Sequence, residues 1–150
     1  CWARGQAWGV AGTALNYKYV PESFVFDNHT KITDTFINKL PGDNVPYWDM
    51  DFKPEDNEPR DTSASAIAAC GILEMSKFHR NEAHLDAVSK MLTALIDNYL
   101  TENIEWANGI LSDGMYSRPS GHRSESVIWG DYFFFEALMR IKKPNIKLYW

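Results

Sequence analysis

The sequence predicts an all-α fold built from helical hairpins. Apolar residues recur at helical spacing in several stretches, and clusters of proline and glycine separate these stretches. The connections alternate between short and long, and residues typical of binding sites lie in the long ones. This alternation is typical of an array of helical hairpins.

The first helix is expected over about residues 4–19, where Pro21 stops it. Its three glycines each weaken the intrinsic helicity by up to about 1 kcal/mol, so it needs packing against other elements. A second helix is expected from the mid-twenties to Leu40, because Ile32, Phe36 and Leu40 recur at four-residue spacing before a proline.

Residues 41–60 contain four prolines and predict a long ordered loop. This loop carries Trp48 and the carboxylate pair Asp49 and Asp51, which shows no metal-ligand spacing with the neighbouring acids and histidines. We therefore expect a functional loop and no metal site.

A third helix is expected to begin with Asp61 or Thr62 as N-cap and to run to about Phe78. An aspartate before Thr-Ser at a helix start is an N-cap more often than a catalytic acid, so we interpret Asp61 as structural. The many alanines of this helix indicate close contacts with other helices.

Asn81 is expected to cap a fourth helix that ends near Leu100 and has one apolar stripe. Residues 106–129 are rich in glycine and predict one short β-hairpin or extended loop. A last helix is expected over about residues 131–142.

Composition limits the partners of the chain. Its 150 residues and formal net charge of −5 argue against a nucleic-acid surface, and no apolar run suits a membrane span. Cys1 and Cys70 are predicted to be free thiols. No phosphate loop or nucleophile elbow is present, so the sequence implies no cofactor.

The first nine residues hold two tryptophans, an arginine and a glutamine among small residues. Indoles stack on sugar rings and a guanidinium binds a carboxylate bidentately, so Trp2, Arg4 and Trp8 suit an acidic sugar. The alternative is that both tryptophans belong to the core and Arg4 makes an internal ion pair. The residues alone leave both interpretations open.

Three blocks in order resemble the C-terminal part of the unsaturated glucuronyl hydrolases, glycoside hydrolase family 88. They are Arg-Gly-Gln-Ala-Trp-Gly at 4–9, Glu-Pro-Arg-Asp-Thr-Ser-Ala at 58–64, and Trp-Gly-Asp-Tyr-Phe-Phe at 129–134 followed by Glu-Ala-Leu at 136–138. The resemblance implies an (α/α)6 toroid of six hairpins, of which residues 1–150 form the C-terminal portion of a single domain whose N-terminal portion is missing. This chain would supply the last two or three hairpins.

The same resemblance implies hydration of the 4,5 double bond of unsaturated glucuronic acid in lyase-generated, glycosaminoglycan-type oligosaccharides. The expected partners are that oligosaccharide and the missing N-terminal part, with no nucleic acid and no membrane. The family's catalytic aspartates precede the first block, so no catalytic residue is expected in this chain.

The resemblance assigns Trp2, Arg4, Gln6 and Trp8 to substrate binding, although Gln6 could instead hold its helix to a neighbouring loop. It also points to Ser117, Ser120 and His122. Relatives that act on sulfated substrates carry Ser-x-x-Ser-x-Lys there, and in this chain His122 stands where the lysine would be. A neutral imidazole binds anions less well than an ammonium near neutral pH. The alternative for the serines is hydrogen bonding within a turn.

Other functions remain open from the sequence. An unsaturated rhamnogalacturonyl hydrolase shares the fold and reaction class, and a non-catalytic carbohydrate-binding homologue or a helical scaffold would lack the acid or the ligand. The leading hypothesis is a cytoplasmic or periplasmic glycoside hydrolase.

Overall fold

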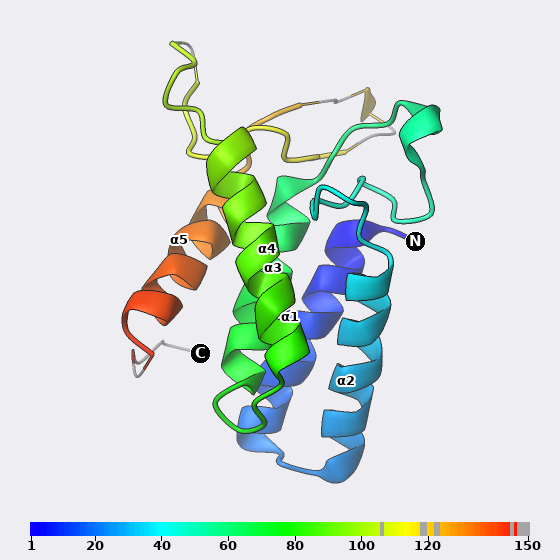
Figure 1. Ribbon diagram of the computed structural model, residues 1–150, viewed down its shortest axis with the longest axis vertical. Coiled ribbons are helices and arrows are strands. Elements are labelled where there is room, and N and C mark those ends of the chain that lie inside the picture. Colours follow the sequence, from blue (N-terminus) through cyan, green and yellow to red (C-terminus); the bar gives the residue numbers. More distant parts are fainter. Residues whose placement is uncertain (106, 118–119, 122–123, 145, 147–150) are drawn as a thin grey trace.

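A computed structural model shows a two-layer array of helices (Figure 1). It describes residues 1–105, 107–117, 120–121, 124–144 and 146. The α-helices are α1 (Ala3–Tyr19), α2 (Ser23–Asn38), α3 (Thr62–Met75), α4 (Glu82–Asn98) and α5 (Ile128–Lys142), with a short 3-10 helix at Pro54–Asp56. The described residues contain isolated β-bridges and no longer strand pairing. The prediction of an all-α fold is confirmed.

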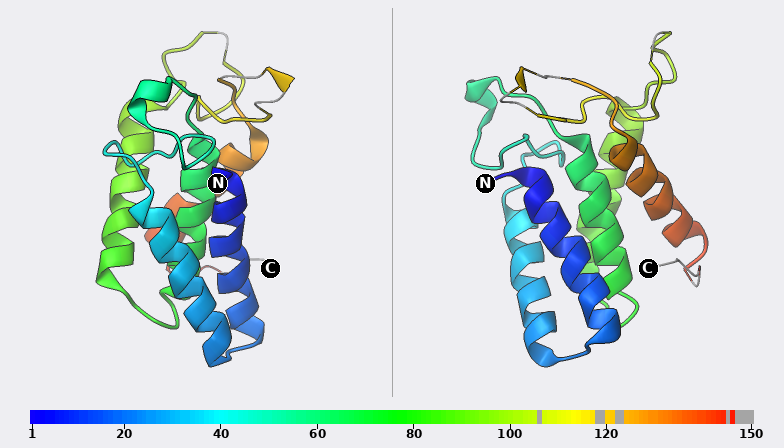
Figure 2. Two further views of the ribbon diagram at one scale, coloured as in Figure 1. Left: turned by 90° about the vertical axis from the view of Figure 1, so that its right-hand side faces the viewer. Right: turned by 180° about the vertical axis from the view of Figure 1, so that it is seen from behind.

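Helices α1, α3 and α5 run in the same direction, and α2 and α4 return antiparallel to them (Figures 1 and 2). Helix α3 lies in the middle, because it contacts α1, α4 and α5, while α2 packs on α1. The array therefore holds the hairpins α1–α2 and α3–α4, and α5 stands beside α3. Short turns close both hairpins at one end, and the long loops 39–61 and 99–127 lie at the other.

Small residues allow α1 and α3 to pack backbone against backbone. Ala3, Ala7, Ala11 and Ala14 form one buried row on α1, and nearly all of α3 is buried. A Cβ built on Gly71 of α3 would lie 2.7 Å from the Cα of Ala11. The close contacts predicted from the alanines of the third helix are confirmed.

Two helix boundaries differ by several residues from those that the sequence predicts. Helix α3 ends at Met75 rather than near Phe78, because the chain turns toward α4 after Ser76. Helix α5 begins at Ile128 rather than about 131, so Gly130 lies within its first turn. A Cβ at Gly130 would lie 3.2 Å from the Cβ of Ser63, so close packing on α3 accounts for this glycine.

The remaining predictions are matched by the described residues. Asn81 caps α4, since its side chain accepts hydrogen bonds from the amides of Ala83 (3.0 Å) and His84 (3.3 Å). Of the two alternatives for 106–129, the described residues of this range before α5 form an extended loop with an isolated antiparallel bridge of Gly114 with Glu125 and no longer strand pairing. Cys1 and Cys70 are free thiols.

A buried histidine links α1 and α2. His29 is 1% exposed, and its two ring nitrogens lie 3.0 Å and 3.3 Å from the hydroxyls of Thr13 and Thr33. Burial, with a smaller contribution from the charge of His84, lowers the pKa of His29 from 6.5 to about 4. The ring is therefore neutral at neutral pH.

Gly71→Ala is expected to destabilise the protein by about 1–3 kcal/mol, because the added methyl group meets the backbone of α1. The matched control is Gly12→Ala on the same helix pair. No atom lies within 4 Å of its added Cβ, and a gain of about 0.5–1 kcal/mol is expected. Urea unfolding measures both, and equal stabilities would contradict the packing described for α1 and α3.

Acidification is expected to weaken the protein through His29. The unfolded chain binds a proton near pH 6.5 and the folded chain only near pH 4, so stability falls as pH decreases through this window. Between pH 7 and pH 5 the wild type should lose about 2 kcal/mol more than His29→Gln. Urea midpoints across this range measure the difference, and parallel pH curves would refute it.

Candidate functional site

The guanidinium of Arg4 lies where α1, α3 and the loop 99–127 meet. Arg4 is in the first turn of α1 and is 6% exposed. Its Nη1 donates to the carbonyl of Met115 at 2.5 Å and lies 3.4 Å from both Asp61 Oδ2 and Ser63 Oγ. Its Nη2 donates to the carbonyl of Tyr116 at 3.0 Å. One side chain thus joins three segments that are far apart in the sequence.

Two indole rings lie against this guanidinium. The Cζ of Arg4 is 5.3 Å from the ring centroid of Trp2 and 5.0 Å from that of Trp129. Tyr116 extends the aromatic surface, with its ring 5.8 Å from that of Trp129. Such contacts stabilise a cation and keep water from it.

The hydrogen bonds of the Arg4 guanidinium use its Nη1 and Nη2 atoms and leave Nε without a partner among the described residues. An arginine has five N–H donors. Both hydrogens of Nη1 and one of Nη2 are directed to the acceptors named above, which leaves Nε–H and the second Nη2–H without a partner among the described residues. Nε and Nη2 form one side of the fork, the geometry that binds a carboxylate bidentately.

Asp61 is fully buried and does not act as the predicted cap. It holds the N-cap position of α3, yet its side chain makes no capping hydrogen bond. Its Oδ1 accepts from the hydroxyl of Ser63, and Oδ2 faces Arg4. Burial raises the pKa of Asp61, and the Ser63 hydroxyl and the Arg4 charge act against that rise. The prediction that Asp61 is structural agrees with these contacts, but the capping role is wrong because the carboxylate turns toward Arg4.

Both tryptophans of the first motif are exposed, at 50% for Trp2 and 41% for Trp8. Trp8 meets Phe133 of α5 edge-on, with ring centroids 5.2 Å apart. Gln6 is half-buried one turn above Trp2. Of the two interpretations of this motif, the core role of the tryptophans is wrong, and the internal ion pair of Arg4 is present.

The serine segment begins directly after the carbonyl that Arg4 binds. Ser117 and Ser120 lie with their hydroxyl oxygens 3.0 Å apart in an exposed turn. The turn interpretation therefore accounts for their contact with each other, and both hydroxyls lie near the surface. His122 is outside the described residues.

The long loop 39–61 borders the same end of α1. The amide of Ala3 donates to the carbonyl of Trp48 at 2.9 Å, and Trp2 forms a bridge with Asp49. The indole N–H of Trp48 donates to Glu58 at 3.0 Å, which orients this ring. The loop is ordered, as predicted, and its Trp48 backbone is bonded to the start of α1.

Sequence reasoning missed Trp129 and the partnership of Asp61 with Arg4. Trp129 opens the third sequence block, so an aromatic search of that block would have found it. Its indole N–H is buried without a partner among the described residues, which costs free energy unless a ligand or water accepts from it. No local signal connects Arg4 to an acid 57 positions away.

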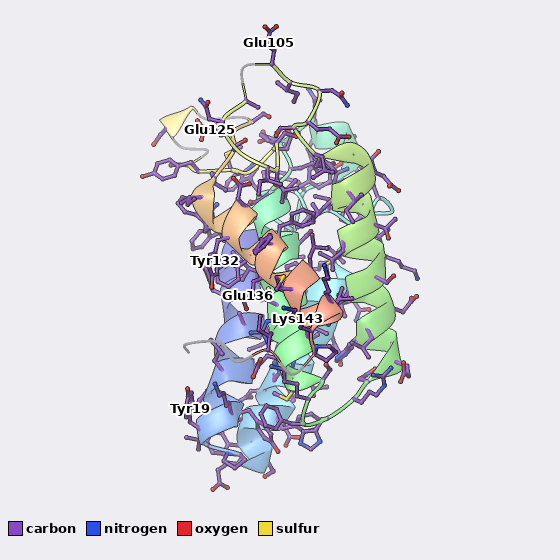
Figure 3. The ribbon with its side chains drawn as sticks, turned by 90° about the vertical axis from the view of Figure 1, so that its left-hand side faces the viewer. Tyr19, Glu105, Glu125, Tyr132, Glu136 and Lys143 are labelled. Carbon is purple, nitrogen blue, oxygen red and sulfur yellow. The ribbon has the colours of Figure 1, made fainter. Side chains whose placement is uncertain are left out.

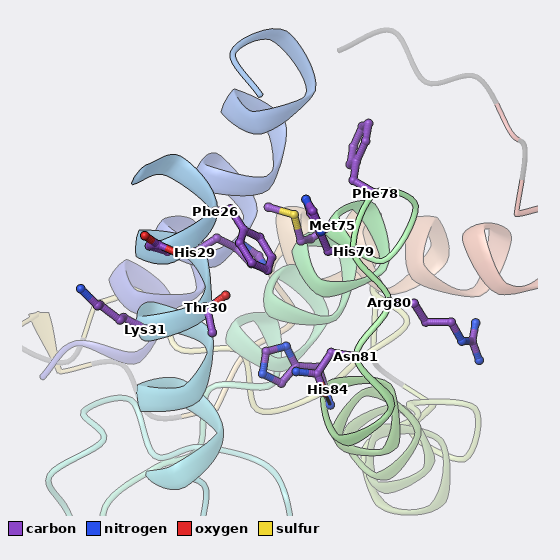
Figure 4. A pocket seen from close by; sticks show the side chains of 11 residues that line it. Phe26, His29, Thr30, Lys31, Met75, Phe78, His79, Arg80, Asn81 and His84 are labelled. Carbon is purple, nitrogen blue, oxygen red and sulfur yellow. Dashed lines mark hydrogen bonds between the residues drawn. The ribbon is translucent and has the colours of Figure 1, made fainter. Parts of the chain in front are cut away.

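A cavity of about 830 Å³ among the described residues lies at the opposite end of the bundle. Figure 4 shows it between the first half of α2 and the turn leading into α4, lined by Phe26, His79 and His84 among others. Its lining mixes Asp27 with Lys31 and Arg80, and it contains none of the predicted site residues. The arrangement around Arg4 is therefore the candidate site.

The described residues contain neither a candidate metal site nor a membrane-spanning helix. No group of three or more His, Cys, Asp and Glu among them could hold a metal ion. Within the same residues, no helix is long and apolar enough to cross a membrane.

No protein-family model matches the chain. It is 43% identical over its whole length to the unsaturated chondroitin disaccharide hydrolase of Streptococcus pneumoniae and 36% identical over 99% of its length to the unsaturated glucuronyl hydrolase of Bacillus sp. strain GL1. The chain spans 39% and 41% of these two relatives, respectively. It also matches a crystal structure of unsaturated glucuronyl hydrolase from Streptococcus agalactiae with dGlcA-GalNAc6S, at TM-score 0.94 and 40% identity, over all of this chain and 41% of that one.

The free energy of unfolding should fall more when Arg4 alone is removed than when Arg4 is removed together with its acidic partner. Arg4→Ala leaves the buried Asp61 carboxylate without its cation, and a loss of about 3–5 kcal/mol is expected. In Arg4→Ala with Asp61→Ala no charge remains buried, so part of that loss should be recovered. Urea unfolding of both single variants, the double variant and the wild type tests this, and strictly additive losses would contradict the ion pair.

Proposed function

This chain belongs to the unsaturated glucuronyl hydrolases, and we therefore propose that the protein hydrates the 4,5 double bond of an unsaturated glucuronic acid at the non-reducing end of an oligosaccharide. The observation that carries this proposal is the match over the whole chain to a hydrolase structure holding dGlcA-GalNAc6S. The arginine, the indole rings beside it and the nearby serine turn supply the kinds of side chain that can bind such a ligand.

The reaction consumes one water for each glycosidic bond that is broken. A general acid gives a proton to C4 and a water molecule adds to C5, so that C5 becomes a hemiketal. Ring opening of the hemiketal gives a ketone and exposes the C1 hemiacetal, which releases the remaining saccharide with a hydroxyl group. The protein must supply a carboxyl group within hydrogen-bond reach of C4 and of the water.

Within this chain, Arg4 is proposed to bind the uronate carboxylate through its Nε–Nη2 edge, and Trp2 and Trp8 to form the walls of the sugar pocket. Gln6 is proposed as a further polar contact from the same motif. Ser117 and Ser120, with His122, are proposed to meet the adjoining sugar, whose hydroxyl or sulfate groups the two exposed hydroxyls suit.

We assign no catalytic carboxylate to this chain. Asp61 is buried and bound to Arg4, which removes it from reach of a sugar. We propose that the acid belongs to a part of the protein outside these 150 residues, and that this chain is the C-terminal portion of one (α/α)6 domain. Helix α5 supports this, because Ile128, Tyr132 and Phe135 are exposed at the spacing of one helix face. Figure 3 shows Tyr132 on the outer side of this helix.

The substrate is proposed to be of the glycosaminoglycan type. The relatives from Streptococcus pneumoniae and Streptococcus agalactiae are named for unsaturated chondroitin disaccharide. Sulfate binding is expected to be weaker than in relatives with a lysine at the position of His122, because a neutral imidazole carries no charge.

The full-length protein, of which this chain is proposed to be the C-terminal portion, is expected to abolish the ultraviolet absorbance of the conjugated enol ether in unsaturated chondroitin or hyaluronan disaccharide. Unsaturated rhamnogalacturonan disaccharide is the control, and preference for it would transfer the proposal to the pectin-directed alternative. A folded protein that binds these disaccharides without changing the absorbance would overturn the hydrolase and support a non-catalytic homologue.

A further inference from the structure

A fully buried carboxylate stands beside the proposed substrate-binding arginine, and the proposed reaction does not use it. Asp61 is 0% exposed, so it cannot meet a sugar. A carboxylate in the interior costs free energy unless the protein gains from it. The contacts of Asp61 indicate what the protein gains, because its cationic partner is Arg4, the proposed substrate-binding arginine.

Several segments that are far apart in the sequence contact the Arg4 guanidinium. The indoles of Trp2 and Trp129 lie over the group, and the carbonyls of Met115 and Tyr116 receive hydrogens from Nη1 and Nη2. Both carbonyls come from the same loop. Asp61, at the start of α3, adds an acceptor on the most buried helix of the array.

We propose that Asp61 is a positioning residue, which acts through Arg4 and fixes the guanidinium so that its Nε–Nη2 edge faces the carboxylate of the unsaturated uronate. This inference rests on the proposed function. Asp61 balances the charge of Arg4, so recognition depends on two directed hydrogen bonds rather than on net charge. Such a site selects a planar carboxylate and discriminates against its uncharged ester.

Asp61→Asn tests this proposal, because it keeps the size of the side chain and removes its charge. The substrates are unsaturated chondroitin disaccharide and the methyl ester of its uronate. With the acid, kcat/KM should fall by about ten- to a hundred-fold, mainly through KM, since a charge-assisted hydrogen bond is weakened. With the ester, which cannot use the Arg4 fork bidentately, the change should be less than about three-fold.

Asp131→Asn is the matched control. Asp131 Oδ1 accepts from the amide of Leu111 at 2.9 Å, so this aspartate also ties the loop 99–127 to the start of a helix, without contacting Arg4. Its loss should change the acid and the ester equally. If Asp61→Asn does not fold, Ser63→Ala replaces it, because the Ser63 hydroxyl bonds to Asp61 and lies 3.4 Å from Arg4 Nη1.

The outcomes separate the inference from the proposed function. These assays use the full-length protein, and a full-length wild type that converts neither substrate overturns the hydrolase itself, and the inference with it. If the wild type is active and Asp61→Asn loses acid and ester turnover to the same degree, as Asp131→Asn should, Asp61 is structural and the inference is wrong. A loss confined to the acid supports it.

Discussion

The burial of one guanidinium constrains the loop end of this molecule. A buried cation must be paired and hydrogen-bonded, because burying it otherwise costs several kcal/mol. Arg4 meets this requirement with acceptors from α3 and from residues 115 and 116. Neither long loop is free to move independently, since loop 39–61 is bonded to the start of α1 and loop 99–127 to Arg4. The position of the loops therefore follows from the packing of α1 on α3.

The direction of the helices brings three helix N-termini to the end that holds the candidate site. Helices α1, α3 and α5 are parallel, so their N-termini gather at the side of the long loops. The partial positive charge of helix N-termini favours an anion there. The opposite end is closed by short turns instead of long loops. The cavity at that end is lined by an acidic residue as well as by two basic residues, so its charge favours an anion less. An acidic sugar suits the loop end better.

The helices could be predicted from the sequence because their apolar periodicity is local. The stripe of α4 and its Asn81 cap needed no knowledge of the fold. The sequence places the start of α5 about three residues late, because the close packing of Gly130 on Ser63 of α3 is a tertiary contact that has no local signal. The ion pair of Asp61 also depends on a residue from another helix, so the local capping pattern could not reveal it. The local sequence, an aspartate followed by Thr-Ser, is the same whether the carboxylate caps the helix or faces an arginine from another helix.

The two interpretations of Arg4 from its sequence, sugar ligand and internal ion pair, are compatible in this geometry. A guanidinium has separate edges, so its Nη1 end can be bound within the protein while the Nε–Nη2 edge remains for a ligand. A lysine could not do both, because its ammonium is a point charge with three donors around one nitrogen. The structural pair even improves the site, since a freely rotating side chain would lose entropy on binding. Arginine is therefore required at this position by the fold and by the proposed chemistry together.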